Sequence, residues 1–266
     1  MAIKKMKSAP VGVIDKVLVI LELLDRNPGG LKLKEIAEQS GINKSTAHRF
    51  LSHLETRSYL FRDNSGTYMI GPKLTKLGTG VSSHVTLAKM CRGVLENLRA
   101  VTGETVNLAV LDGFDVLYVD VLETGHTFRL VSEIGMRRPF YCTSLGKAIL
   151  ANIKDEHTHE ELVASIRFDP VTPRTITNLA RLKKQLALIL KRGFALDDEE
   201  AVAGIRCLGA AIFGADGEVV GAISVSGPVV RVTTARLPLF SQEICRAARE
   251  ITWLLGNNSI KPSKAL

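Results

Sequence analysis

Residues 33–55 read LKEIAEQSGINKSTAHRFLSHLE, and this stretch decides the fold of the first third of the chain. Apolar residues recur at helical spacing on both sides of Ser40-Gly41-Ile42-Asn43, which is typical of two helices joined by a tight turn. Counted from Leu33, small Ala37 is fifth and Gly41 is ninth. Two helices that cross steeply need a small residue at their closest approach and a residue that tolerates positive φ in the turn. The stretch therefore predicts a helix-turn-helix, with helices over about 33–39 and 44–57.

Further elements on both sides complete the pattern of a winged helix-turn-helix. An apolar stripe predicts a first helix over about 13–26, which the sequence Asn27-Pro28-Gly29-Gly30 ends. Residues 59–71 read YLFRDNSGTYMIG, in which two strand-like runs flank the turn sequence Asp63-Asn64-Ser65-Gly66. This second stretch predicts a β-hairpin directly after the third helix, which is the position of a wing.

The polar face of the third predicted helix carries side chains that suit DNA. Arg49 is suited to guanine in a major groove, and the hydroxyl groups are suited to phosphates. Ser and Thr are poor choices for a helix face that is merely solvated, so DNA binding is favoured over that alternative. The DNA-binding candidates, including two from the hairpin, are Lys44, Ser45, Thr46, His48, Arg49, Ser52, Arg62 and Asn64.

The formal net charge of +8 is concentrated in the first third of the chain. Residues 1–80 hold 13 Lys and Arg against 7 Asp and Glu, whereas residues 81–266 hold 22 against 20. This asymmetry indicates a basic module that meets a polyanion, joined to a nearly neutral module with another task. By charge alone, a solvated basic face is an equal alternative.

The composition excludes several other classes of protein. Hydrophobic residues make up 45% of the 266 residues and charged residues 23%, which predicts a globular rather than a disordered chain. No apolar run approaches the roughly 20 residues that span a bilayer, and no secretory signal is recognisable. The four cysteines lie far apart, without metal-ligand spacing. We therefore expect a cytoplasmic protein with reduced thiols and without a membrane, metal or cofactor partner.

The remaining two thirds of the chain predict a long helix followed by an α+β domain. The apolar stripe between Leu87 and Leu98 is either a linker and dimer contact or a part of the second domain. Consecutive strand-like runs with helices between them indicate an antiparallel sheet with helices packed on it. The expected strands are 105–111, 116–122, 127–133, 206–213 and 219–226, and the expected helices are 144–152, 155–166, 179–192 and 234–255. The expected domains are 11–72 for DNA binding, 73–101 for the linker helix region and 102–257 for the second domain.

Two stretches of the second domain could bind a small molecule. In YCTSLGKAILA (141–151), free backbone N–H groups near Ser144, Leu145 and Gly146 would favour a carboxylate or phosphate, although the hydroxyls could equally be a simple helix cap. Ser224 and Ser226 are two apart on a strand, so both point to one face, which is either a polar pocket or the solvent side of an edge strand. Further residues that could face such a pocket are Asp197 and Cys207, of which Cys207 could also be plain core.

An enzyme is the competing class of protein, and the sequence gives it no support. His157 and His159 are two apart, which on a helix directs them to different faces and suits a metal poorly. Cys142 and Ser144 are possible nucleophiles, but no G-x-S-x-G elbow surrounds them. Neither a Walker loop nor a G-x-G-x-x-G loop occurs. We therefore predict that the protein is not an enzyme.

Over about residues 11–257, the chain resembles the IclR family of bacterial transcriptional regulators. The resemblance depends on LKEIAEQSGINKSTAHRFLSHLE, the wing ending in YMIGPKL, the central CTSLGKA and the late IRCLGAAIFGADGEVVGAISVSGP, in this order. It implies an α+β two-domain protein with a winged helix-turn-helix, a linker helix and a GAF-like domain that binds a small effector. It also implies a homodimer, or a tetramer of paired dimers, that binds a pseudo-palindromic operator in double-stranded DNA.

The same resemblance implies a pocket for a small organic or aromatic acid. The matching positions are Ser144, Leu145, Gly146, Asp197, Cys207, Ser224 and Ser226, and Phe128 and Leu130 on the third expected strand would also face the ligand. Where some relatives have a smaller residue this chain has Leu145, which bears on the size of the effector. The expected function is a transcriptional regulator whose operator binding the effector controls. The alternative is a small-molecule-binding enzyme or sensor whose N-terminal domain binds polyanions without specificity.

Overall fold

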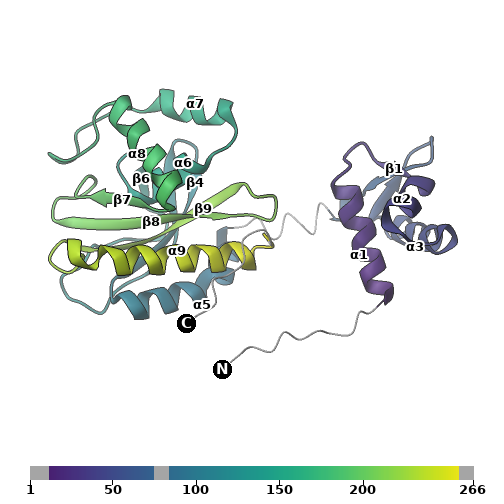
Figure 1. Ribbon diagram of the computed structural model, residues 1–266, viewed down its shortest axis with the longest axis horizontal. Helices are drawn as coiled ribbons and strands as arrows, with labels where there is room; N and C mark the ends of the chain where they lie inside the picture. The colour runs from purple at the N-terminus through teal and green to yellow at the C-terminus, as the bar shows by residue number, and fades with distance from the viewer. Residues whose placement is uncertain (1–11, 75–83, 258–266) are drawn as a thin grey trace. The chain divides into compact units, whose positions relative to one another are not determined.

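The computed structural model describes residues 12–74 and 84–257, which belong to two units that divide between Ser83 and His84 (Figure 1). The expected linker region 73–101 therefore lies partly outside the described residues, at 75–83. Its described helix, α5 (His84–Thr102), belongs to the C-terminal unit. Within the described ranges, no helix is long and apolar enough to cross a membrane.

The N-terminal unit is a winged helix-turn-helix, as predicted. A buried cluster that includes Ile20, Ile36 and Leu51 joins its three helices, and Gly41 ends the second helix with a φ of 67°. A three-stranded antiparallel sheet of order β1-β3-β2 forms the wing. The elements are α1 (Gly12–Asp25), β1 (Leu31–Lys32), α2 (Leu33–Ser40), α3 (Lys44–Thr56), β2 (Leu60–Arg62) and β3 (Thr67–Ile70).

The C-terminal unit is a six-stranded antiparallel sheet of order β6-β5-β4-β9-β8-β7, with helices on both faces (Figure 1). Helices α5 and α9 cover one face, and α6 and α8 cover the other. Its strands are β4 (Thr105–Asp112), β5 (Asp115–Leu122), β6 (Arg137–Pro139), β7 (Ala195–Asp198), β8 (Ile205–Phe213) and β9 (Val219–Pro228). Its other helices are α6 (Ser144–Asn152), α7 (Glu156–Ser165), α8 (Leu179–Arg192), the 3₁₀ turn η1 (Thr234–Arg236) and α9 (Leu237–Leu254).

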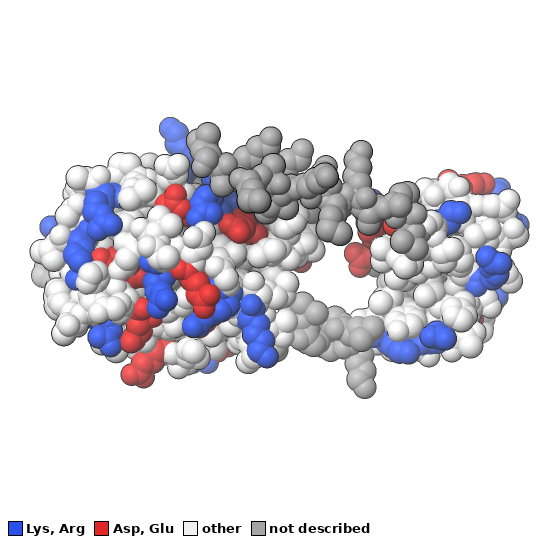
Figure 2. Space-filling view, turned by 90° about the horizontal axis from the view of Figure 1, so that it is seen from below, with Lys and Arg blue, Asp and Glu red and all other residues white. Residues whose placement is uncertain are grey.

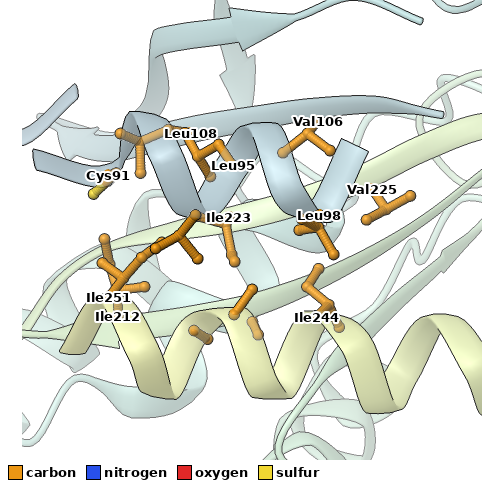
Figure 3. Packing of buried hydrophobic residues seen from close by; sticks show 14 of the residues in the cluster. Cys91, Leu95, Leu98, Val106, Leu108, Ile212, Ile223, Val225, Ile244 and Ile251 are labelled. Carbon is orange, nitrogen blue, oxygen red and sulfur yellow. The ribbon is translucent and has the colours of Figure 1, made fainter. Parts of the chain in front are cut away.

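The two faces of this sheet differ in chemistry because side chains alternate along each strand. Figure 3 shows Val106 and Leu108 of β4 in an apolar core with Leu95 and Leu98 of α5 and with Ile244 of α9. The stripe of α5 therefore lies on the second domain, which was one of the two alternatives left open by the sequence.

The side chains on the opposite face of the sheet are smaller, and several of them are polar. Ala109 and Ala222 lie under α6, and Asn107, Ser224 and Ser226 are buried on the same side. A face with small side chains lets a helix approach closely, and its polar groups need partners because they are cut off from water. This side of the sheet is therefore where a polar site forms.

The expected strand over 127–133 is wrong. Those residues form no strand, and the edge of the sheet beside β5 is instead occupied by Arg137–Pro139, which pairs with residues 115–117. A strand requires a hydrogen-bonded neighbour, and β6 already takes the free edge of β5. Two of its apolar side chains are exposed, Phe128 at 67% and Val131 at 55%, and Leu130 is half-buried.

Two glycines fix the first turn of α6 against its surroundings. A Cβ atom on Gly209 of β8 would lie 2.6 Å from the carbonyl oxygen of Ser144, and one on Gly146 would lie 2.2 Å from the Cα of Phe140. Both neighbours are backbone atoms, which cannot rotate away as a side chain can. Glycine at these two positions therefore allows α6 to lie directly against its surroundings, and a larger residue at either position would force the backbones apart.

Gly209→Ala is expected to destabilise the C-terminal unit by roughly 1–3 kcal/mol, because the added methyl group must displace the start of α6. Gly93→Ala is the matched control, since Gly93 lies inside α5 with open space around its Cα. It should be stabilising by up to about 1 kcal/mol through helix propensity. Urea unfolding followed by circular dichroism measures both changes, and equal effects of the two substitutions would contradict the close approach.

Candidate functional site

The helix α3 begins with a polar cap that shapes its exposed face. The Asn43 side chain accepts hydrogen bonds from the Ser45 backbone N–H at 3.0 Å and from the Ser45 hydroxyl at 2.8 Å. The Ser45 hydroxyl is therefore held by the cap. At the wing, Asp63 accepts from the backbone N–H groups of Ser65 and Thr67, which orders the turn that carries Asn64.

The predicted DNA-binding side chains lie at the surface of the N-terminal unit. Thr46 is half-buried, and the other seven are exposed: Lys44, Ser45, His48, Arg49, Ser52, Arg62 and Asn64. Figure 2 shows several separate Lys and Arg side chains on the visible face of this unit, together with a few acidic ones. An exposed helix face with cations and hydroxyls, followed by a basic wing, is the chemistry that contacts phosphates and base edges.

The second site is a small polar cavity on the α6 side of the C-terminal sheet. Its volume is about 20 Å³, which is room for about one water molecule. The start of α6 and the strands β7, β8 and β9 form one part of its wall, and residues 130–136 with β5 and β6 form the rest. Its polar lining residues are Tyr118, Ser132, Arg138, Thr143, Ser144, Asp197, Cys207, Ser224 and Ser226.

Six of the nine predicted effector-binding residues line this cavity, namely Leu130, Ser144, Asp197, Cys207, Ser224 and Ser226. The other three lie elsewhere. The Phe128 side chain is 67% exposed, and Leu145 is buried in the apolar cluster beneath α6. Gly146 donates its backbone N–H to the Thr143 hydroxyl at 3.1 Å, so that Thr143 is the helix cap. The N–H groups of Ser144 and Leu145 remain in the first turn, where no intrahelical acceptor exists.

Asn107 contacts both serines, and it was not among the residues predicted from the sequence. The fully buried Asn107 side chain donates to the hydroxyl oxygens of Ser224 at 3.1 Å and of Ser226 at 3.3 Å. The two hydroxyl oxygens also lie 3.5 Å from each other, and Ser226 hydrogen-bonds the Cys207 thiol, so Asn107, the serines and Cys207 form one polar network in the cavity wall. The only signal in the sequence is an amide within an otherwise apolar strand, and its register opposite Ser224 requires the structure.

Asp197 is the acidic group of the cavity. It accepts from the backbone N–H groups of Glu200 at 2.7 Å and Ala201 at 3.2 Å. Burial raises its pKa to about 7, with Lys147 opposing this shift and Glu200 adding to it. Cys207 beside it has a pKa well above the ordinary value because it is buried, so it is a neutral thiol rather than a nucleophilic thiolate.

A buried ion pair underlies the cavity. Lys147 of α6 has no exposed side-chain surface, and its Nζ atom donates to Glu200 at 2.5 Å and to the Leu196 carbonyl oxygen at 2.6 Å. These bonds connect the helix that carries Ser144 to the segment that carries Asp197. The ion pair therefore holds two parts of the cavity wall in fixed relation.

A winged helix-turn-helix joined to an α+β domain with a small polar cavity defines a DNA-binding regulator with a sensory domain. Comparison with known protein families gives the particular family. The IclR helix-turn-helix domain matches residues 13–64, and the C-terminal domain of the bacterial transcriptional regulator IclR matches residues 79–253. The chain belongs to the IclR family, and it is a transcriptional regulator rather than an enzyme.

Individual relatives agree with this assignment. The HTH-type transcriptional regulator BhcR of Paracoccus denitrificans is 35% identical over 247 residues, which cover 92% of this chain and 88% of BhcR. The crystal structure of Thermotoga maritima IclR is 34% identical with a TM-score of 0.62, over 91% of this chain and 98% of that one. An IclR homologue from Microbacterium hydrocarbonoxydans, crystallised with 4-hydroxybenzoate, has the same fold at 22% identity, with a TM-score of 0.60 over 91% and 98% of the two chains.

Asp197→Asn is expected to make the stability of the C-terminal unit less dependent on pH. Because the folded-state pKa of about 7 lies above the ordinary value of 3.8, the folded protein holds this proton when the unfolded chain has lost it. Stability therefore falls as the pH rises from about 4 to about 7 and stays at the lower level above that. The difference in the free energy of unfolding between the variant and the wild type should therefore shift in favour of the variant by on the order of 2 kcal/mol from pH 5 to pH 8.

Urea unfolding of both proteins at the two pH values, with the transition of the C-terminal unit followed by circular dichroism, measures this difference. A constant offset between variant and wild type at pH 5 and pH 8 would show that Asp197 does not retain a proton in the folded protein.

Proposed function

We propose that a small carboxylic acid is the effector of this regulator and that it binds in the cavity at the start of α6. The observation that carries the proposal is the convergence of hydrogen-bond donors there. The hydroxyls of Ser144, Ser224 and Ser226 line the cavity, and because Asn107 donates to both Ser224 and Ser226, each of these hydroxyls can turn its own proton to a ligand oxygen. The first turn of α6 adds unpaired N–H groups and the positive end of the helix dipole. The 4-hydroxybenzoate bound to the Microbacterium homologue supports a carboxylate as the class of ligand.

Binding of an acid in this cavity requires a movement of its wall. A volume of about 20 Å³ is far below the roughly 300 Å³ of typical small-molecule sites. The part that would move is the segment with Leu130, Val131 and Ser132, because residues 127–133 form no strand, whereas Gly135 and Met136 are hydrogen-bonded to the backbone of Tyr118 in β5. We therefore infer that the effector opens the cavity and that this change, transmitted through the linker region 73–101, alters operator affinity. Such couplings are typically about 1–3 kcal/mol.

On the DNA side, α3 would lie in the major groove with Lys44, Thr46, His48, Arg49 and Ser52 toward the bases and phosphates. The wing would place Arg62 and Asn64 on the backbone. The exposed apolar side chains of α1, among them Val13 at 59% and Ile14 at 56%, support a homodimer or a larger homo-oligomer. Two copies would occupy half-sites of a pseudo-palindrome roughly 34 Å apart. Because its partner is genomic DNA, we infer that the protein acts in the cytoplasm.

Arg49→Ala should weaken binding to the operator by about 1–3 kcal/mol and have little effect on binding to a scrambled duplex, because a bidentate contact to guanine is lost. Fluorescence anisotropy with the intergenic DNA upstream of the gene and with the scrambled duplex measures both affinities. Arg49→Lys keeps the charge without the bidentate geometry and is expected to lose discrimination as well. Unchanged discrimination in both variants would mean that Arg49 does not read bases.

Ser224→Ala should abolish the response of operator affinity to carboxylic acids and leave DNA binding without effector intact. The matched control is Ser241→Ala, because Ser241 lies in α9 on the other face of the sheet and donates to the Pro238 carbonyl. The experiment is the same anisotropy titration with a panel of aliphatic and aromatic acids. If no acid changes the affinity of the wild type, or if Ser224→Ala responds fully, the proposed function is wrong.

A further inference from the structure

Two consecutive arginines on the edge strand β6 have different surroundings. Side chains alternate between the faces of a sheet, so Arg137 and Arg138 point in opposite directions. Arg137 makes an ion pair with Asp112 and a hydrogen bond to the Asp112 carbonyl oxygen, and it is half exposed. Arg138 is opposite Val116, which is buried in the cluster beneath α6, and it lines the cavity.

Arg138 lacks an acidic partner among the residues that the structure describes. Within 12–74 and 84–257, no carboxylate lies within ion-pairing distance of its guanidinium group, and the interaction that it does make is with the phenol of Tyr118 in the cavity wall. A partly buried guanidinium group without an anion loses hydration and gains little in exchange. An anion in the cavity would supply the missing partner.

The cation and the hydroxyl donors belong to separate parts of the wall. Arg138 belongs to β6, one edge of the six-stranded sheet, whereas Ser224 and Ser226 belong to β9, with β5 and β4 between these strands. Three strand spacings of about 4.8 Å each separate the backbones of β6 and β9, so the serines and Arg138 approach the cavity from different sides. A ligand with two acidic groups could pair with the Arg138 guanidinium group and also accept hydrogen bonds from the serine hydroxyls.

Building on the proposed function, we propose that Arg138 determines the specificity of the cavity and that the effector is a small dicarboxylic acid. One carboxylate accepts from Ser144, Ser224 and Ser226, and the other pairs with the Arg138 guanidinium group. Asp197 lies at β7, the opposite edge of the sheet from β6, so the second carboxylate is directed toward the cation and away from the acid.

Calorimetric titration of the full-length protein with matched acids tests this proposal. The pairs are succinate with butyrate, glutarate with valerate, and phthalate with benzoate, each at constant ionic strength and pH 6.5, where Asp197 is mostly protonated. For at least one pair, the wild type should bind the dicarboxylate at least tenfold more tightly than its monocarboxylate analogue. Arg138→Leu should remove that difference, and Arg137→Leu should preserve it, because the neighbouring arginine lies on the other face of the strand.

The outcomes separate this proposal from the proposed function. If the wild type binds both members of every pair equally, or if Arg138→Leu keeps the preference, the proposed role of Arg138 is wrong. The proposal that the effector is a carboxylic acid is not affected by that result. If neither kind of acid binds, the proposed function itself fails. Should Arg138→Leu not fold, as judged by circular dichroism, Arg138→Lys is the second variant, and it should keep a reduced preference for the dicarboxylate because it keeps the charge.

Discussion

The first turn of α6 lies directly against the backbone of β8, where Gly209 leaves no space for a side chain. This contact decides where the hydrogen-bond donors of the helix start are relative to the serines of β9. The buried bonds from Lys147 to Glu200 and to the Leu196 carbonyl then fix the same helix to the β7 segment. Strand pairing through β8 already brings Asp197 of β7 near the serines of β9, and the contacts of α6 add Ser144 to the same cavity.

The same ion pair sets the charge of the cavity. Lys147 is one buried cation, and Asp197 and Glu200 are two buried carboxyl groups near it. One cation balances one carboxylate, and ionising the second in a dry environment is costly, which is why the pKa of Asp197 rises. Below pH 7, where Asp197 is mostly protonated, the inner wall carries no net negative charge. The cavity can then accept an anion in spite of the acidic residue in its lining, and a protonated Asp197 can donate to it.

The sequence predicted the helix-turn-helix, the wing and most of the sheet, because these elements have local signals: apolar spacing, Gly41 in the turn, and paired serines on one strand. Six of the nine effector-binding residues predicted from the sequence line the cavity. The sequence missed Asn107, Lys147 and Arg138, whose roles depend on register and on contacts between distant segments, for which a single sequence has no pattern. The error at 127–133 has the same cause. Whether an apolar run forms a strand depends on which segment pairs with the free edge of β5, and in this fold that segment is β6.

The size of the cavity constrains how the regulator can work. A ligand shifts a conformational equilibrium only by the difference between its affinities for the two states. In the conformation described here, with about 20 Å³ of space, an organic acid has no room, so its affinity for this state is negligible. If an acid binds here as proposed, it favours only a state in which residues 130–132 have moved, and the free energy needed to open the cavity is subtracted from its binding free energy. A closed cavity thus lowers the apparent affinity for the ligand, but it makes the coupling between binding and the conformational change complete, because the closed state binds none.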